Sequence, residues 1–277
     1  DNQAHPLDWL GFFLSALFMA TLVGGFESLG QGGPSIAVSG ALIATGFISG
    51  ALYYWHSQHH SNPILDLSLL KIHTFRVSTI AGNLCRFGVG AVPYLLALLL
   101  QIGFGLSALS AGLITFAGAV GAMAMKMAAP RILNRWGYRR VLTVNAVFTG
   151  ASLAACALFT ASTPAVVMIG VLLFGGFFRS LQFTAINTLA YADISQASMS
   201  RASSFAAMGQ QLGVSLGVGV AAEALHLSML WRGSNELIAA DVVVGFLVIG
   251  VLCALPSFSF WRLPPEAGES LRQNRLG

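Results

Sequence analysis

Residues 126–142 read KMAAPRILNRWGYRRVL, a short basic stretch between two long apolar runs. It holds five of the fourteen Lys and Arg residues in the 277-residue chain. Membrane proteins keep Lys and Arg in short cytoplasmic loops, because the bilayer and the membrane potential oppose moving these charges outward. The stretch is therefore predicted to be a cytoplasmic loop, and the other loops are predicted to alternate outward from it.

The composition is that of a membrane protein. Hydrophobic residues make up 56% of the chain and charged residues 9%, whereas soluble domains carry about 25% charged residues. The net charge of +4 indicates no nucleic-acid partner, because the cations are scattered over short loops and form no single basic face. Cys85, Cys156 and Cys253 fall in apolar runs and are interpreted as packing residues, not as a disulfide or metal framework.

Eight stretches are long enough to cross the membrane as helices, which takes about 20 apolar residues. They lie near residues 9–26, 35–55, 75–100, 108–127, 139–161, 164–190, 202–226 and 240–261. The sequence lacks the alternation of polar and apolar residues that is typical of membrane barrels. It therefore predicts an all-α membrane protein with eight transmembrane helices.

The basic residues are distributed unequally between the two sides. With residues 126–142 inside, eleven Lys and Arg fall in cytoplasmic segments and only Arg232 in an outward loop, while Arg86 and Arg179 lie within spans. This split predicts that both termini are cytoplasmic. Residues 63–70, PILDLSLL, form a short amphipathic stretch that is predicted to lie along the inner membrane surface.

The basic stretch resembles the loop signature of the major facilitator superfamily, G-x-x-x-D-R-x-G-R-R. Pro130 stands in place of the first Gly, and Asn134 replaces the Asp. Four residues match the signature: Arg135, Gly137, Arg139 and Arg140. Residues 6–11 (PLDWLG), 100–107 (LQIGFGLS), 111–113 (AGL) and 187–189 (NTL) extend the likeness. Together these segments resemble the fourteen-span drug:proton antiporters, the EmrB/QacA subfamily.

The resemblance implies four segments. Residues 1–60 would be an extra transmembrane hairpin, 61–74 a cytoplasmic amphipathic linker, 75–262 a C-terminal six-helix transporter domain and 263–277 a cytoplasmic tail. The chain begins at Asp1 without an initiator Met, and it is expected to be part of a longer protein. The resemblance places the proton-carrying carboxylate and the antiporter signature in the N-terminal six helices, which this chain lacks.

In that family each six-helix domain consists of two inverted three-helix units, and substrate binds near mid-membrane between two domains. The implied partners are the lipid bilayer, a small-molecule substrate, protons and the missing N-terminal six-helix domain. The implied location is the bacterial inner membrane.

Polar residues inside the predicted spans are candidates for lining a substrate cavity: Asn83, Arg86, Arg179, Gln182, Asn187, Gln210 and Gln211. Arg86 lies ten residues beyond Arg76, about 15 Å along a helix and so near mid-bilayer. An Arg facing lipid there costs at least about 2.5 kcal/mol. It is expected to face a cavity or, alternatively, to be held structurally by backbone carbonyls or by a carboxylate of the missing half. Arg179 either lines the cavity or joins an inter-helix hydrogen-bond network.

Two such arginines without an intramembrane acidic partner in this half favour an anionic or carboxylate-bearing substrate. Gln210 and Gln211 either reach the cavity or bond across helices.

Other residues are predicted to act in conformational change or packing. Pro93, with Gly88 and Gly90, interrupts the span 75–100, either as a hinge or as a static bend. A small-x-x-x-small face lets a neighbouring helix approach closely, and it is formed by Gly209, Gly213 and Gly217. The arginines of the basic stretch either hold one transport state through charge pairs or only fix topology. Asn134 weakens such pairing, since an amide cannot form the salt bridge of the family's Asp.

No enzyme chemistry is predicted. Residues 213–217, GVSLG, match a nucleophile motif formally but lie in an apolar helix, and no Walker sequence occurs. His56, His59 and His60 are interpreted as solvated loop histidines, so no metal or cofactor is predicted. The sequence predicts the C-terminal part of a proton-coupled secondary efflux transporter for drugs or small organic molecules, anionic ones among them. The alternative is a non-transporting membrane module that binds a partner chain through its glycine faces.

Overall fold

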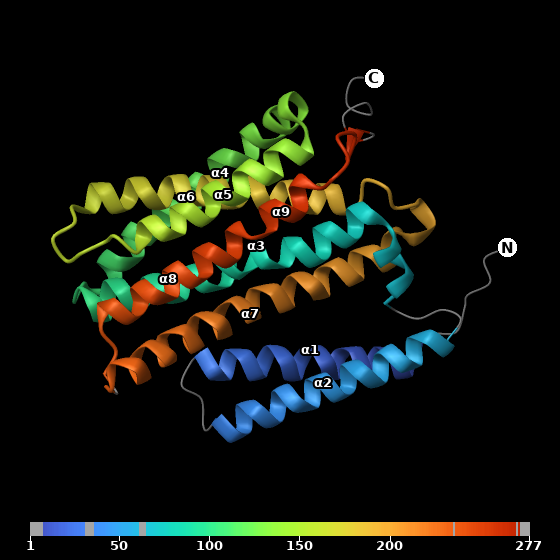
Figure 1. Cartoon of the computed structure of the whole chain (residues 1–277), viewed down its shortest axis with the longest axis horizontal. Helices are drawn as coiled ribbons and strands as arrows, with labels where there is room; N and C mark the ends of the chain where they lie inside the picture. The colour runs from blue at the N-terminus through green and yellow to red at the C-terminus, as the bar shows by residue number, and fades with distance from the viewer. Residues whose placement is uncertain (1–7, 31–35, 61–64, 235, 270, 272–277) are drawn as a thin grey trace.

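The structure is a computed structural model that describes residues 8–30, 36–60, 65–234, 236–269 and 271 (Figure 1). Every element within those residues is helical, which confirms the predicted all-α class. The long helices are α1 (Trp9–Gly30), α2 (Ile36–His59), α3 (His73–Ala97), α4 (Ala108–Trp136), α5 (Tyr138–Cys156), α6 (Ala165–Ala190), α7 (Met199–Arg232) and α8 (Ala239–Ala254). The short pieces are α9 (Pro256–Trp261), the 3-10 turns Leu67–Lys71 and Gln196–Ser198, and a π-helical segment after α3, Leu98–Gly103.

Seven helical segments of the described chain are long and apolar enough to cross a membrane: Trp9–Ser28, Ala37–His59, His73–Gly103, Ala108–Trp136, Ala165–Ala190, Gln196–Arg232 and Ala239–Trp261. The remaining predicted span, residues 139–161, is shorter in the structure. It forms α5, which ends at Cys156 and carries Arg139 and Arg140 in its first turn. These two charges lower its mean hydropathy, although α5 lies along α6 and α8 inside the same bundle.

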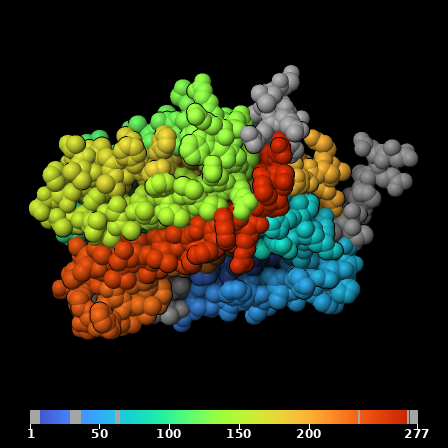
Figure 2. Space-filling model, turned by 45° about the horizontal axis from the view of Figure 1, so that its top comes forward, coloured from blue at the N-terminus to red at the C-terminus, as the bar shows by residue number. Residues whose placement is uncertain are grey.

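The bundle is built around α3, which packs against α6, α7 and α8. α4 packs along α6, and α5 packs against both α6 and α8. Suppose that α3, α4 and α5 correspond in order to α6, α7 and α8. The α4–α6 contact then corresponds to the α7–α3 contact, and the α5–α8 contact corresponds to itself. This is the pairing expected of two inverted three-helix units. In the space-filling view α8 and α9 form a red band between α5 and the α1–α2 hairpin (Figure 2).

The α1–α2 hairpin joins the bundle through α1, which lies along α7. Gly219 of α7 leaves room there for the Phe26 ring, because a Cβ at this position would lie 2.9 Å from Phe26 Cδ1. The faces of the hairpin that point away from α7 expose large apolar side chains, Phe13, Phe47 and Trp55 among them. In a membrane protein such faces contact lipid.

Side-chain contacts join the chain segments at one end of the bundle, which we call the basic end. The segments are the α2–α3 linker, the start of α3, the α4–α5 junction, the α6–α7 connection and the end of α9. The contacts are Arg201–Asp66 at 3.3 Å, Thr74–Asp193 at 2.8 Å and Arg139 Nε–Trp261 O at 2.9 Å. Arg232 lies at the opposite end, where it pairs with the buried Asp241 at 2.7 Å.

The prediction that residues 126–142 form a loop is wrong. α4 continues through Pro130 to Trp136, α5 starts at Tyr138, and only Gly137 separates them. Gly137 has a φ of 76°, a left-handed value that residues with a Cβ rarely adopt. Charge density suggested a loop, but the basic side chains lie on the last turns of α4 and the first turn of α5. Lys126 is therefore a helix residue.

The linker contains one short helical turn. Within the described part of residues 61–74, Leu67–Lys71 forms a single 3-10 turn, and the Asp66 carboxylate accepts a hydrogen bond from the Ser68 N–H at its start. Leu69 is buried in a small core with Phe75 and Ile194. The turn is thus packed against the ends of α3 and α6.

Candidate functional site

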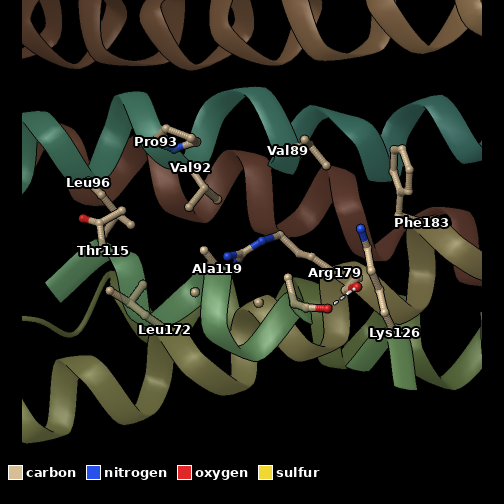
Figure 3. Close-up of a pocket in the computed structure, with 14 residues that line it drawn as sticks. Val89, Val92, Pro93, Leu96, Thr115, Ala119, Lys126, Leu172, Arg179 and Phe183 are labelled. Carbon is tan, nitrogen blue, oxygen red and sulfur yellow. Dashed lines mark hydrogen bonds between the residues drawn. The ribbon is translucent and has the colours of Figure 1, made fainter. Parts of the chain in front are cut away.

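A cavity of ≈ 430 Å³ lies between α3, α4 and α6 (Figure 3). Its lining residues are Val89, Val92, Pro93, Leu96, Thr115, Gly118, Ala119, Ala122, Lys126, Leu172, Gly176, Arg179, Ser180 and Phe183. The wall is mostly apolar, with two cationic side chains and no acidic one among these described residues. Such a site suits an apolar molecule that carries a negative group.

Glycines bring α4 and α6 into backbone contact beside this cavity. A Cβ at Gly121 would lie 1.9 Å from Leu173 O, and one at Gly176 would lie 1.9 Å from Gly118 O. Either side chain would force the two helices apart. Ser180 adds a hydrogen bond of 2.8 Å from its hydroxyl to Ala122 O across the same crossing.

Arg179 extends across the cavity from α6 towards α4 (Figure 3). Its guanidinium lies against two glycines: Nη1 is 3.1 Å from the Cβ position of Gly175, and Nη2 is 3.4 Å from that of Gly118. Within the described residues it makes no hydrogen bond and no ion pair. Its five N–H donors are therefore available to a group that enters the cavity.

Lys126 is the second cation of the cavity, and the sequence analysis missed it (Figure 3). It was assigned to a loop because it opens the basic stretch, yet it lies well inside α4. Like Arg179, it has no hydrogen-bond or ion-pair partner in the described part of the chain. The predicted span 108–127 already included Lys126, but the residue was counted with the cytoplasmic cations of the basic stretch and so was not considered for the cavity.

Arg86 is held in a different way. It is only 3% exposed, and its Nη1 donates to Asn83 Oδ1 at 2.9 Å while its Nη2 donates to Asn187 Oδ1 at 2.7 Å. The guanidinium carbon also lies 5.8 Å from the centre of the Phe183 ring, which lines the cavity. The structure thus joins Asn83, Arg86 and Asn187 in one network, and Arg86 also lines a narrow pocket together with Arg179 and Phe183 of the cavity wall.

Gln182 belongs to a second buried network, between α5 and α6. It is 1% exposed; its Oε1 accepts a hydrogen bond of 2.8 Å from Asn145 Nδ2, and its Nε2 donates to Leu142 O at 3.3 Å. Asn145 also donates to Phe178 O at 2.8 Å. Gln182 therefore takes part in helix packing and does not line the cavity of Figure 3, although it lines a narrow pocket together with Arg86 and Arg179.

The glycines of α7 face α3. A Cβ at Gly217 would lie 2.2 Å from Phe87 O, and one at Gly213 would lie 3.2 Å from Asn83 O. A Cβ at Gly209 would lie 3.3 Å from Nδ2 of the Asn83 side chain. Gln210 is half-buried and Gln211 exposed on the same helix, and neither lines the cavity of Figure 3.

Pro93 lies inside α3 and lines the cavity, shortly before the π-helical segment Leu98–Gly103. The two glycines that precede it, Gly88 and Gly90, pack against different helices. Gly90 contacts α7, since a Cβ there would lie 2.0 Å from Val214 O, whereas a Cβ at Gly88 would lie 3.1 Å from Cys253 Sγ of α8. Both glycines therefore allow close packing of α3.

The residues of the signature meet at the α4–α5 turn around Gly137. Arg139 donates its bond to Trp261 O at the end of α9. Asn134 is half-buried, Arg135 and Arg140 are exposed, and none of these three forms an ion pair with a described residue. The junction thus presents free cationic groups at the basic end of the bundle.

Fold and cavity together define a polytopic helical membrane protein with a solute-sized site on one wall of a six-helix bundle. A family model described as "Major Facilitator Superfamily" matches residues 9–218 and 78–275. The chain belongs to that superfamily.

Similar proteins from bacteria carry names that refer to multidrug resistance or transport. "Putative multidrug resistance protein MdtD" of Serratia proteamaculans is 33% identical over 95% of this chain and 56% of its own length. The protein of the same name from Pectobacterium atrosepticum is 34% identical over 99% of the chain and 59% of its own length. "Probable transport protein HsrA" of Haemophilus influenzae is 30% identical over 98% and 59%. The chain therefore spans less than two thirds of the length of these relatives.

Proposed function

We propose that this chain is the C-terminal part of a proton-coupled secondary transporter that exports small amphipathic molecules bearing a negative group. The efflux part of the proposal is supported by superfamily membership and by relatives named for multidrug resistance. In this proposal the basic end faces the cytoplasm of a bacterium, because that side of the inner membrane retains Lys and Arg.

The observation that carries the substrate class is the pair of cations in an apolar cavity. Arg179 and Lys126 both line it, and neither has an acidic partner in the described chain. Arg179 is half-buried and Lys126 is exposed at the cavity, and a cation that is withdrawn from water without a counter-charge is costly. A carboxylate or another oxyanion of the substrate offsets that cost, and Arg179 can bind it with two parallel N–H donors. The apolar wall around Leu96, Leu172 and Phe183 accommodates the rest of the molecule.

Coupling to protons is assigned to the segment that precedes this chain. No acidic residue lines the described cavity, and Glu223 of α7, the one acidic candidate of that helix, is exposed. Alternating access needs a second domain that rocks against the α3–α4–α6 wall. We therefore expect the 277-residue chain alone to move no substrate.

The alternative, a membrane module that binds a partner chain through its glycine faces, requires glycine faces that are open to a partner. Gly209, Gly213 and Gly217 already pack against α3 of the same chain. A partner helix could reach them only by displacing α3 from the centre of the bundle.

The test uses the full-length protein in everted membrane vesicles, with a set of substrates that are carboxylated, neutral or cationic. Arg179→Ala is expected to lower the transport efficiency for carboxylated substrates by about 10–100-fold, since a hydrogen bond to a charged group contributes about 1.5–3 kcal/mol. Arg179→Lys keeps the charge and is expected to retain more of that transport. Arg262→Ala, at an exposed position outside the cavity, is the matched control.

Unchanged transport of every carboxylated substrate by Arg179→Ala would remove the proposed substrate class. Loss of all substrates alike, neutral ones included, would instead assign Arg179 to conformational change or folding.

A further inference from the structure

A cluster of three metal-binding residue types lies at the base of the α1–α2 hairpin, far from the cavity. Asp8 immediately precedes α1, His56 lies in the last turn of α2, and His60 follows α2 directly. The backbone His60 N–H still donates to His56 O at 3.1 Å, so the two histidines are one helical turn apart on the same face. Antiparallel packing of α1 against α2 brings Asp8 to that face.

The three side chains converge. His56 Nε2 lies 2.8 Å from Asp8 Oδ1, and the rings of His56 and His60 are 5.1 Å apart at their centres. One ligand atom from each of the three residues lies within 4.8 Å of the other two. A tetrahedral zinc ion has bonds of about 2.0–2.1 Å to nitrogen and about 2.0–2.2 Å to carboxylate oxygen. Small side-chain rotations therefore suffice to bring all three atoms onto one ion.

The Asp8 carboxylate has one oxygen that is available to bind a metal ion. Asp8 is 4% exposed, and its Oδ1 also accepts a hydrogen bond of 2.8 Å from the Gly11 N–H at the start of α1. Its second oxygen, Oδ2, is buried and accepts no hydrogen bond from the described residues. A carboxylate with such an unbonded buried oxygen is a competent metal ligand.

We propose that Asp8, His56 and His60 form a binding site for a divalent transition-metal cation of the zinc type. Two imidazoles and one carboxylate match the donors that Zn²⁺, Co²⁺ and Ni²⁺ prefer, whereas Mg²⁺ and Ca²⁺ prefer oxygen ligands. Three protein ligands leave a fourth position for water. The sequence interpretation of the histidines as solvated missed this site, because the carboxylate lies 48 residues away from His56 in the chain.

A metal ion bound at this site would affect how the α1–α2 hairpin is attached to the bundle. The bound ion would fasten the start of α1 to the end of α2. One turn before His56, Tyr53 exchanges two hydrogen bonds with Leu65 of the linker, at 2.7 and 3.1 Å. The linker continues into α3, so the ion would stiffen the junction between the hairpin and the six-helix bundle.

The experiment measures Zn²⁺ binding by calorimetry and Co²⁺ binding by visible absorption. It uses full-length protein with a tag free of histidine, purified in detergent and stripped with EDTA. His60→Gln removes one ligand and leaves the Asp8–His56 hydrogen bond in place. Loss of outer-shell partners already costs about 10–100-fold in metal affinity, so losing a direct ligand is expected to weaken Zn²⁺ binding at least about tenfold. His59→Gln is the matched control, because His59 is exposed and bonds to Trp55 O.

A wild-type protein that binds no Zn²⁺, or His60→Gln protein that binds it as tightly as His59→Gln protein, would overturn the site and leave a simple Asp–His clamp. His56→Gln provides a second variant if His60→Gln protein fails to fold, and equal binding by that variant would overturn the proposal too. Thermal midpoints measured in EDTA verify folding. None of these outcomes depends on what the protein transports.

Discussion

Arg86 and Arg179 occupy similar places on similar helices but have opposite surroundings. Each lies near the middle of the first helix of its three-helix unit, α3 or α6. Arg86 is 3% exposed and is held by the amide oxygens of Asn83 and Asn187. Arg179 is half-buried, lines the cavity and bonds to no described residue.

The difference shows what an intramembrane arginine can do. Amide oxygens accept one hydrogen bond each from Nη1 and Nη2 of Arg86 without neutralising its charge, so this residue links α3 to α6. The donors of Arg179 remain free where a solute can reach them, so this residue is suited to recognition. Three comparisons of stability test this division.

The largest change in stability is expected where the helix crossing beside Arg179 is broken. Gly121→Ala would place a Cβ 1.9 Å from Leu173 O and is expected to lower the free energy of unfolding by about 2–3 kcal/mol, as overpacking does. Gly112→Ala is the matched control on α4, because nothing lies within 4 Å of its Cβ position. Thermal unfolding in detergent, followed with a thiol-reactive dye, reports the change through the buried Cys85, Cys156 and Cys253. Equal thermal unfolding midpoints for Gly121→Ala and Gly112→Ala would contradict the close backbone contact between α4 and α6.

A smaller effect is expected from removing each arginine in turn. Arg86→Leu leaves the oxygens of Asn83 and Asn187 without their donor and is expected to lower the free energy of unfolding by about 1–2 kcal/mol. Arg179→Leu removes a cation that has no described partner and is expected to leave stability unchanged or raised. The same dye measurement checks both variants. Destabilisation by Arg179→Leu alone would reverse the roles assigned to the two residues.

The smallest effect is expected from a single acceptor of Arg86. Asn83→Ala leaves the bond to Asn187 in place, so a loss of about 1 kcal/mol is expected. Asn134→Ala is its control, since Asn134 makes no hydrogen bond with a described residue. If Asn83→Ala changes export selectivity with no change in the unfolding midpoint, the Arg86 network belongs to the substrate site and not to the framework.

Much of the fold could be predicted from the sequence, because apolar runs and their lengths follow directly from the bilayer. The superfamily also followed from residues that stand close together, such as Arg135, Gly137, Arg139 and Arg140. The loop predicted at residues 126–142 was wrong because charge alone does not reveal that a helix continues beyond the hydrocarbon region. Lys126 lies inside the predicted span 108–127 but was counted with the loop cations, and it was therefore left out of the cavity candidates.

The candidate site could be predicted only as a set of polar residues, not as an arrangement. Arg86 and Asn187 are 101 residues apart in the chain, and Asn145 and Gln182 are 37 apart, yet each pair shares a hydrogen bond. Whether a polar side chain reaches a partner or a cavity depends on which helices cross and at which glycine. That information is spread over the whole bundle.

The sequence by itself determined that this chain is a bundle of membrane helices with its cations concentrated at one end. It did so because each span must exclude unpaired polar groups from lipid through its own local composition. Only the tertiary structure decided that Arg179 and Lys126 share a cavity, that Arg86 is tied to amides, and that Asp8 meets two histidines. These are contacts between distant segments, and the packing of α3, α6 and the hairpin sets them.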